Sequence, residues 1–140
     1  MEISIIKIMD KDHKRIKELL GLFEIDSNNL QKALESFNRF KWNLEKHFFI
    51  EEKVIFNVTL EDEDQDLSTI LNEHSEILNL MSIIEEELMD NKKPDISEMK
   101  KLLLSHARFE NYIFYPKLDE TLNEEQKQEI IDRIKDIIIN

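Results

Sequence analysis

The sequence LEKHFFIEEKVIF spans residues 44–56, and a similar stretch, LSHARFENYIFYP, spans residues 104–116. In each stretch a histidine is followed four residues later by a glutamate, within a run that is otherwise largely apolar and aromatic. Residues four apart lie on the same face of an α-helix. Each stretch therefore predicts a helix whose apolar face also carries an imidazole and a carboxylate.

The composition favours an all-α protein. The 140 residues include one glycine, two prolines and no cysteine. Hairpins and tight turns need more glycine and proline, and this length suffices for one domain with a sizeable core. The absence of cysteine excludes disulfides, thiolate zinc sites and iron–sulfur clusters, and it fits a cytoplasmic location.

The charge and the apolar runs exclude several classes of partner. The net charge is −12, and no basic stripe with interleaved aromatic residues is present, so we expect no nucleic acid. One glycine cannot build a glycine-rich phosphate loop. The longest apolar runs are too short for a membrane span, and the N-terminal residues lack the basic region of a signal peptide. We therefore expect no membrane partner.

Apolar residues recur at helical spacing in four long segments separated by polar breaks. The spacing predicts helices at about 6–23, 30–58, 67–89 and 94–115, and a shorter fifth helix at about 122–138. Pro94 is expected in the first turn of the fourth helix, Pro116 to end or kink it, and Thr121 to cap the fifth. We predict an all-α, antiparallel up-down-up-down four-helix bundle at about 6–118 with a short C-terminal fifth helix, in a single domain covering 1–140.

Each long helix carries one histidine on its apolar face. The four are His13, His47, His74 and His106. Random placement would put all four on apolar faces with a probability of roughly 0.03, since such a face covers about three positions in seven. Successive histidines also lie at similar distances from the break between them, which places them at the same height in antiparallel helices. We therefore predict one layer of histidines, joined by Glu51 and Glu110 from the opening stretches.

This layer predicts a metal centre with six protein ligands. They are His13, His47, Glu51, His74, His106 and Glu110. A buried carboxylate without a partner is costly, and a cation would offset that cost. Imidazole with carboxylate suits iron, manganese or zinc. Six side chains exceed the needs of one tetrahedral zinc and suit two octahedral ions that share the carboxylates.

Other interpretations of these residues stay open. Core histidines can be hydrogen-bonded packing residues in a metal-free bundle, and the acidic stretch EDEDQD (residues 61–66) is expected to be a loop rather than a calcium site. Glu45 and Glu52 lie off the apolar face and are expected to be solvated. Trp42, Tyr112 and Tyr115 are expected in packing or interfacial roles, although a tyrosine near a two-metal centre could carry a radical or a proton.

In this arrangement the chain resembles the hemerythrin-like, or HHE cation-binding, domains. The resemblance rests on KDHKRI, HFFIEEKVIF, NEHSEIL and HARFENYIFYPKL, which together cover about residues 6–118. It implies a four-helix bundle with a non-haem di-iron centre, in which Glu51 and Glu110 bridge the irons beside an oxo or hydroxo bridge. By the same resemblance, His13 shares one ion with His47, and His74 shares the other with His106.

Two positions depart from the oxygen-carrying members of that family. Leu78 stands four residues after His74, where the carriers have a fifth histidine, and Asn111 stands where they have an aspartate. These departures put reversible oxygen carriage in doubt. The four-histidine, two-glutamate set is similar to the di-iron domain of the repair-of-iron-centres proteins, which act in nitrosative and oxidative stress responses.

The leading functional hypothesis is a non-haem di-iron protein that binds, senses or reacts with O2, NO or peroxide. One alternative is an iron-sensing, iron-donating or storage module without catalysis, and another is a di-iron NO or peroxide reductase with a redox or regulatory protein partner. Whether the protein is an enzyme is left open. The apolar shell of the site is expected to come from Phe37, Phe40, Phe48, Phe109 and Ile113.

Overall fold

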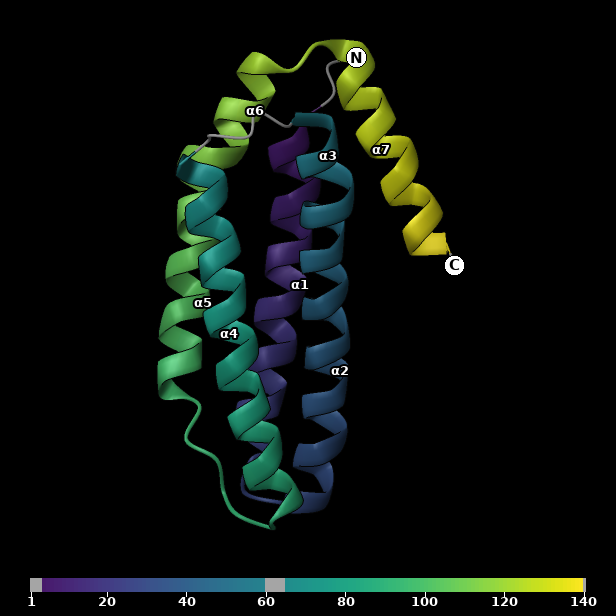
Figure 1. Cartoon of the computed structure of the whole chain (residues 1–140). Coiled ribbons are helices and arrows are strands. Elements are labelled where there is room, and N and C mark those ends of the chain that lie inside the picture. The colour runs from purple at the N-terminus through teal and green to yellow at the C-terminus, as the bar shows by residue number, and fades with distance from the viewer. Residues whose placement is uncertain (1–3, 60–64, 140) are drawn as a thin grey trace.

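Four long helices run side by side in the computed structural model and form an antiparallel bundle (Figure 1). The structure describes residues 4–59 and 65–139. The bundle helices are α1 (Ile5–Asp26), α2 (Leu30–Ile50), α4 (Gln65–Met89) and α5 (Ser97–Phe109). The described residues contain no strand, which confirms the predicted all-α class. None of the helices they form is long and apolar enough to cross a membrane.

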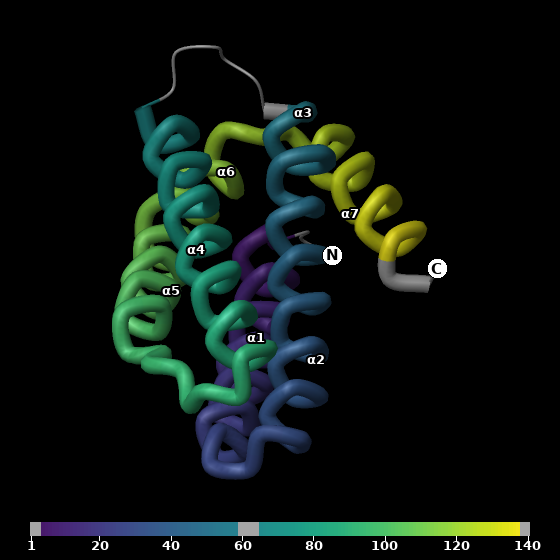
Figure 2. The backbone as a smooth tube through the Cα atoms, turned by 60° about the horizontal axis from the view of Figure 1, so that its bottom comes forward, coloured from purple at the N-terminus to yellow at the C-terminus, as the bar shows by residue number. Residues whose placement is uncertain are grey.

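Two of these helices continue through a π-helical turn. After α2 come η1 (Glu51–Ile55) and α3 (Phe56–Thr59), and after α5 come η2 (Glu110–Phe114) and α6 (Tyr115–Thr121). The last helix, α7 (Glu124–Ile139), lies outside the bundle and contacts η1 (Figure 2). Most of the predicted acidic loop lies outside the described residues, and its last two residues, Gln65 and Asp66, begin α4.

Polar side chains and one left-handed residue define the helix ends. Asn29 Oδ1 accepts the Lys32 backbone N–H at 3.3 Å and caps α2. At the end of α4, Asn91 has a φ of 58°, and the N–H of the next residue, Lys92, bonds to Glu87 O at 2.8 Å. This pair of features stops α4 in the manner of a glycine-terminated helix.

Two details of the helix ends were predicted wrongly, and a third was wrong in part. Pro94 lies before α5, which begins at Ser97, so the proline is outside the helix. Pro116 occupies the first turn of α6, and because the chain stays helical from η2 to Thr121, the proline does not end the helix. Asn123 rather than Thr121 caps α7, since Asn123 Oδ1 accepts the Gln126 N–H at 2.8 Å and the Gln126 side chain accepts the Asn123 N–H.

The core divides into two apolar clusters along the bundle. One holds buried residues of the α1–α2 turn end, including Phe23, Phe37 and Phe40, and the other holds residues near α6 and α7, including Phe114 and Ile130. These five side chains are fully buried. The four histidines belong to neither cluster and lie in the bundle at heights between them. A polar layer is thus enclosed by apolar packing on both sides, which limits its contact with water.

Candidate metal centre

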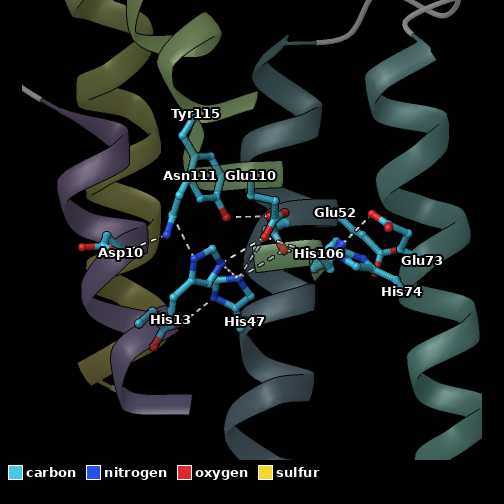
Figure 3. Close-up of polar contacts among 12 residues, drawn as sticks. Asp10, His13, His47, Glu52, Glu73, His74, His106, Glu110, Asn111 and Tyr115 are labelled. Atoms are coloured by element: carbon cyan, nitrogen blue, oxygen red, sulfur yellow. Dashed lines mark hydrogen bonds and ion pairs between the residues drawn. The ribbon is translucent and has the colours of Figure 1, made fainter. Parts of the chain in front are cut away.

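The four histidines meet in one layer, each from a different bundle helix (Figure 3). The ring centroids of His13 and His47 are 4.7 Å apart, and those of His74 and His106 are 4.9 Å apart. Three of these residues are at most 2% exposed, and the His13 side chain is 8% exposed. The predicted layer is therefore confirmed, and the structure brings together all four histidines.

Both predicted glutamates are fully buried and reach the same layer. Glu51 Oε1 lies 3.2 Å from Nε2 of both His47 and His74. Glu110 Oε1 lies 3.0 Å from Nε2 of His13 and 3.3 Å from Nε2 of His106. Each carboxylate thus stands between imidazoles from two different helices. The six predicted site residues form one contiguous cluster.

Each glutamate is the first residue of a π-helical turn, Glu51 of η1 and Glu110 of η2. A π turn holds one more residue than an α turn, so the buried face shifts by one position beyond it. This shift explains why the prediction for Ile113 is wrong: Ile113 is 51% exposed, whereas Phe114 and Tyr115 are buried. Single-turn π segments are frequent at functional sites.

The outward nitrogen of every histidine has an oxygen partner. In three cases it is a carboxylate from a neighbouring helix: Nδ1 of His47 lies 2.7 Å from Asp12, Nδ1 of His106 lies 3.0 Å from Glu73, and Nδ1 of His74 lies 3.3 Å from Glu52. A carboxylate can only accept, so each Nδ1 donates its proton. The lone pair of Nε2 then points into the layer, which is the arrangement that metal-binding histidines need.

The outward nitrogen of His13 has a side-chain amide, rather than a carboxylate, as its acceptor. Its Nδ1 lies 3.0 Å from Asn111 Oδ1, while Asn111 Nδ2 donates to Asp10 at 3.1 Å. The Asp10 contact fixes the orientation of the amide, so its oxygen faces the imidazole. Asn111, noted in the sequence only as a departure from the oxygen carriers, therefore orients His13.

Tyr115 contacts the Glu51 oxygen that does not face His47 and His74. Its hydroxyl donates to Glu51 Oε2 at 2.7 Å, and its side chain is fully buried. The predicted packing role is thus incomplete, because the hydroxyl also contacts the layer. Burial, together with the charges of Glu110 and Glu51, raises the pKa of Tyr115 well above its ordinary value, so the hydroxyl keeps its proton.

The electrostatics of the layer favour cations. Burial lowers the pKa of His106, but the adjacent Glu110 carboxylate outweighs it and raises that pKa to about 9. For His47, burial also lowers the pKa, while Glu51 and Asp12 raise it well above 6.5. Burial raises the pKa of Glu110, yet its contacts with neighbouring side chains hold it well below the ordinary value. The ion-free layer therefore retains protons between its carboxylates and imidazoles.

The donor set fits metal ions. Two groups of side chains bring one ligand atom each to within 4.8 Å of one another: Glu51, His74, His106 and Glu110 form one, and His13, His47 and Glu110 form the other. Among the described residues, Nε2 of His106 and Oε2 of Glu110 are buried without a hydrogen-bond partner. Such orphaned atoms are costly unless a ligand satisfies them. The groups share Glu110, so two neighbouring ions could share a carboxylate.

The outer partners of the histidines were missed in the sequence. Glu52 was expected to be solvated, but it is only partly exposed and contacts His74. A signal was present, since each missed carboxylate is adjacent in sequence to a site residue: Asp12 to His13, Glu52 to Glu51, and Glu73 to His74. Each serves the histidine of another helix, so only the packed bundle identifies its partner.

The comparisons with known proteins agree with this geometry. No curated protein and no solved structure matches the chain. The family model described as "Hemerythrin HHE cation binding domain" matches residues 4–118, which include all six predicted site residues and every outer partner named above. The chain belongs to the hemerythrin HHE cation-binding domain family.

Proposed function

We propose that this protein is a non-haem di-iron protein that binds, senses or reacts with O2, NO or peroxide, within a single domain spanning 1–140. The observation that supports this most is the pair of buried histidine–glutamate groups that share Glu110. In this proposal His13 and His47 hold one iron, His74 and His106 hold the other, and Glu51 and Glu110 lie between them. Bound iron would supply open coordination positions and a change of oxidation state.

The chain's own residues would prepare the centre for that chemistry. The outer carboxylates and Asn111 keep each Nε2 lone pair directed inward. Tyr115 holds one oxygen of Glu51, which leaves the other oxygen facing His47 and His74. The apolar clusters on both sides of the layer limit access of water.

Elemental analysis with a visible spectrum tests this proposal. Protein purified under air should contain about two irons per chain and absorb as a carboxylate-bridged di-iron centre, with a spectrum that changes under nitric oxide. The same experiment on Glu110→Gln, which keeps the side-chain volume, should show loss of iron. Native protein that contains stoichiometric zinc and no iron would contradict the proposal.

A sensing, donating or storage role is a second candidate, favoured by the crowding of acceptor groups in the layer. Nε2 of His13 lies 3.1 Å from Nε2 of His47 and 3.0 Å from Glu110, so these atoms need a proton or a metal ion between them. Metal binding would then stabilise the fold strongly. A large fall in melting temperature on chelation, without reaction with the gases or peroxide, would favour this role. Multiple turnovers with an added reductant would instead indicate a reductase.

A further inference from the structure

A pocket of about 300 Å³ opens between α1 and α5 and reaches the histidine layer. Its lining includes His13, His47 and His106, together with apolar side chains such as Leu44 and Leu103. His74 and the two central glutamates are not part of this lining. The pocket therefore leads to the His13 side of the layer, and its size is at the lower end of that of ligand pockets.

Three cations surround the outer part of this pocket. The lining contains Lys14, Lys17 and Arg108, and its one carboxylate is Asp10. The charge of these four groups is therefore +2 (three cations and one anion), whereas the whole chain carries −12. Local potential at a cleft, rather than net charge alone, governs the approach of a charged ligand.

Two of the three cations have no competing carboxylate. The Lys14 ammonium lies 3.1 Å from Asp10, four residues earlier on the same exposed helix face. Lys17 and Arg108 form no ion pair with any residue that the structure describes, and both are exposed. Their charges are therefore available to an incoming ligand from opposite walls of the pocket, Lys17 from α1 and Arg108 from α5.

We propose that this pocket is the ligand entrance of the metal centre and that its cationic rim speeds the entry of small monoanions, such as nitrite, while leaving the entry of neutral molecules unchanged. This inference rests on the proposed function, because the ligand is taken to reach a metal held by the histidine layer. The rim raises the local concentration of an anion that the rest of the acidic surface repels. The apolar inner wall then favours a ligand of few atoms over a hydrated or bulky one.

Association kinetics with azide as the probe test this effect of the rim. We expect Lys17→Glu and Arg108→Glu each to slow azide association with the oxidised, iron-loaded protein about fivefold to tenfold at low ionic strength, with less effect as salt rises. Association of neutral nitric oxide with the reduced protein should stay within about twofold of the wild-type rate. Lys101→Glu is the matched control, because Lys101 is an exposed residue of α5 that lines another surface depression beside Glu76 and Glu98.

A structural readout independent of reactivity accompanies the kinetics. In crystals of zinc-loaded protein soaked in bromide, anomalous scattering should locate the anion in the pocket, and the double variant Lys17→Glu/Arg108→Glu should lack it. Unchanged azide rates in both rim variants, or an equal loss in Lys101→Glu, would overturn the inference while leaving the proposed function intact. Wild-type protein without bound metal would overturn both, and metal analysis of every variant separates these results.

Discussion

The two halves of the histidine layer have similar ligand chemistry but different surroundings. The open half, His13 and His47, lines the pocket between α1 and α5, and its His13 side chain is 8% exposed. In the other half, the closed half, which holds His74 and His106, only His106 lines the pocket, and the buried ring of Phe48 stacks on His74 at 3.8 Å between centroids. Under the proposed function, this difference predicts that the open half exchanges ligands while the closed half retains its metal.

The largest expected effect comes from the carboxylate that the two halves share. Glu110→Gln should reduce metal content from about two ions per chain to fewer than one, because Glu110 belongs to both ligand groups. His13→Ala removes a ligand of the open half alone and should leave about one ion. Metal analysis after gel filtration measures both. Equal metal loss in the two variants would show that the halves do not bind independently.

The packing of the closed half should be the next most sensitive feature. Phe48→Ala removes a side chain that is 2% exposed and is expected to lower the free energy of unfolding by about 3–5 kcal/mol. The adjacent Phe49→Ala is the control, since Phe49 is 51% exposed and should cost about 0.5 kcal/mol or less. Denaturant unfolding of the two metal-free variants gives the comparison. A similar cost for both would contradict the assignment of Phe48 to the core.

The outer carboxylates allow each half to be weakened separately. Glu73→Ala should reduce metal affinity about 10-fold to 100-fold in the closed half, because His106 loses the acceptor at 3.0 Å that orients it. Asp12→Ala should do the same in the open half through His47. Competition titration with a chelator measures both, and the exposed Glu76→Ala on the same helix as Glu73 should have no effect. If Glu73→Ala bound metal as tightly as the wild-type protein, Glu73 would not be needed to orient His106.

The smallest expected effect is the change in stability of the metal-free protein with pH, which follows from protonation of the histidine layer. The folded-state pKa of His106 is about 9, above the ordinary 6.5, so its contribution to stability is complete below pH 6.5 and is lost as pH rises toward 9. The raised pKa of His47 acts in the same direction. We expect the melting temperature of metal-free protein to fall by a few degrees over this range. Metal-loaded protein should instead lose stability as pH falls, because protons compete for the imidazoles, and identical pH profiles would contradict this account.

The arrangement of the six central residues could be predicted because it depends on simple periodicity. The histidines share the apolar faces of their helices, and each pair is nearly equidistant from its loop, so helical rise alone places them at one height. Glu51 and Glu110 follow by the four-residue spacing. These features need no knowledge of side-chain packing.

The remaining features depend on contacts between helices or on irregular backbone. Asp12 orients a histidine of α2 rather than its own neighbour His13, and only the relative rotation of α1 and α2 decides this. Ile113 was placed inward because the helical period was carried past Glu110 without change, whereas η2 alters the phase. Tyr115 was treated as packing because its hydroxyl contact depends on the same altered phase.

The two π turns also determine how the protein responds to changes in chain length. Because each turn accommodates one residue beyond the α-helical count, deleting a residue within it would restore a continuous α-helix and rotate everything beyond it by about 100°. In η2 such a deletion would carry Tyr115 away from Glu51, while His106 on the preceding turn would keep its place. Glu51 and Glu110 thus mark the positions where the helical phase changes. The side chains on either side of each π turn can therefore pack independently of those on the other side.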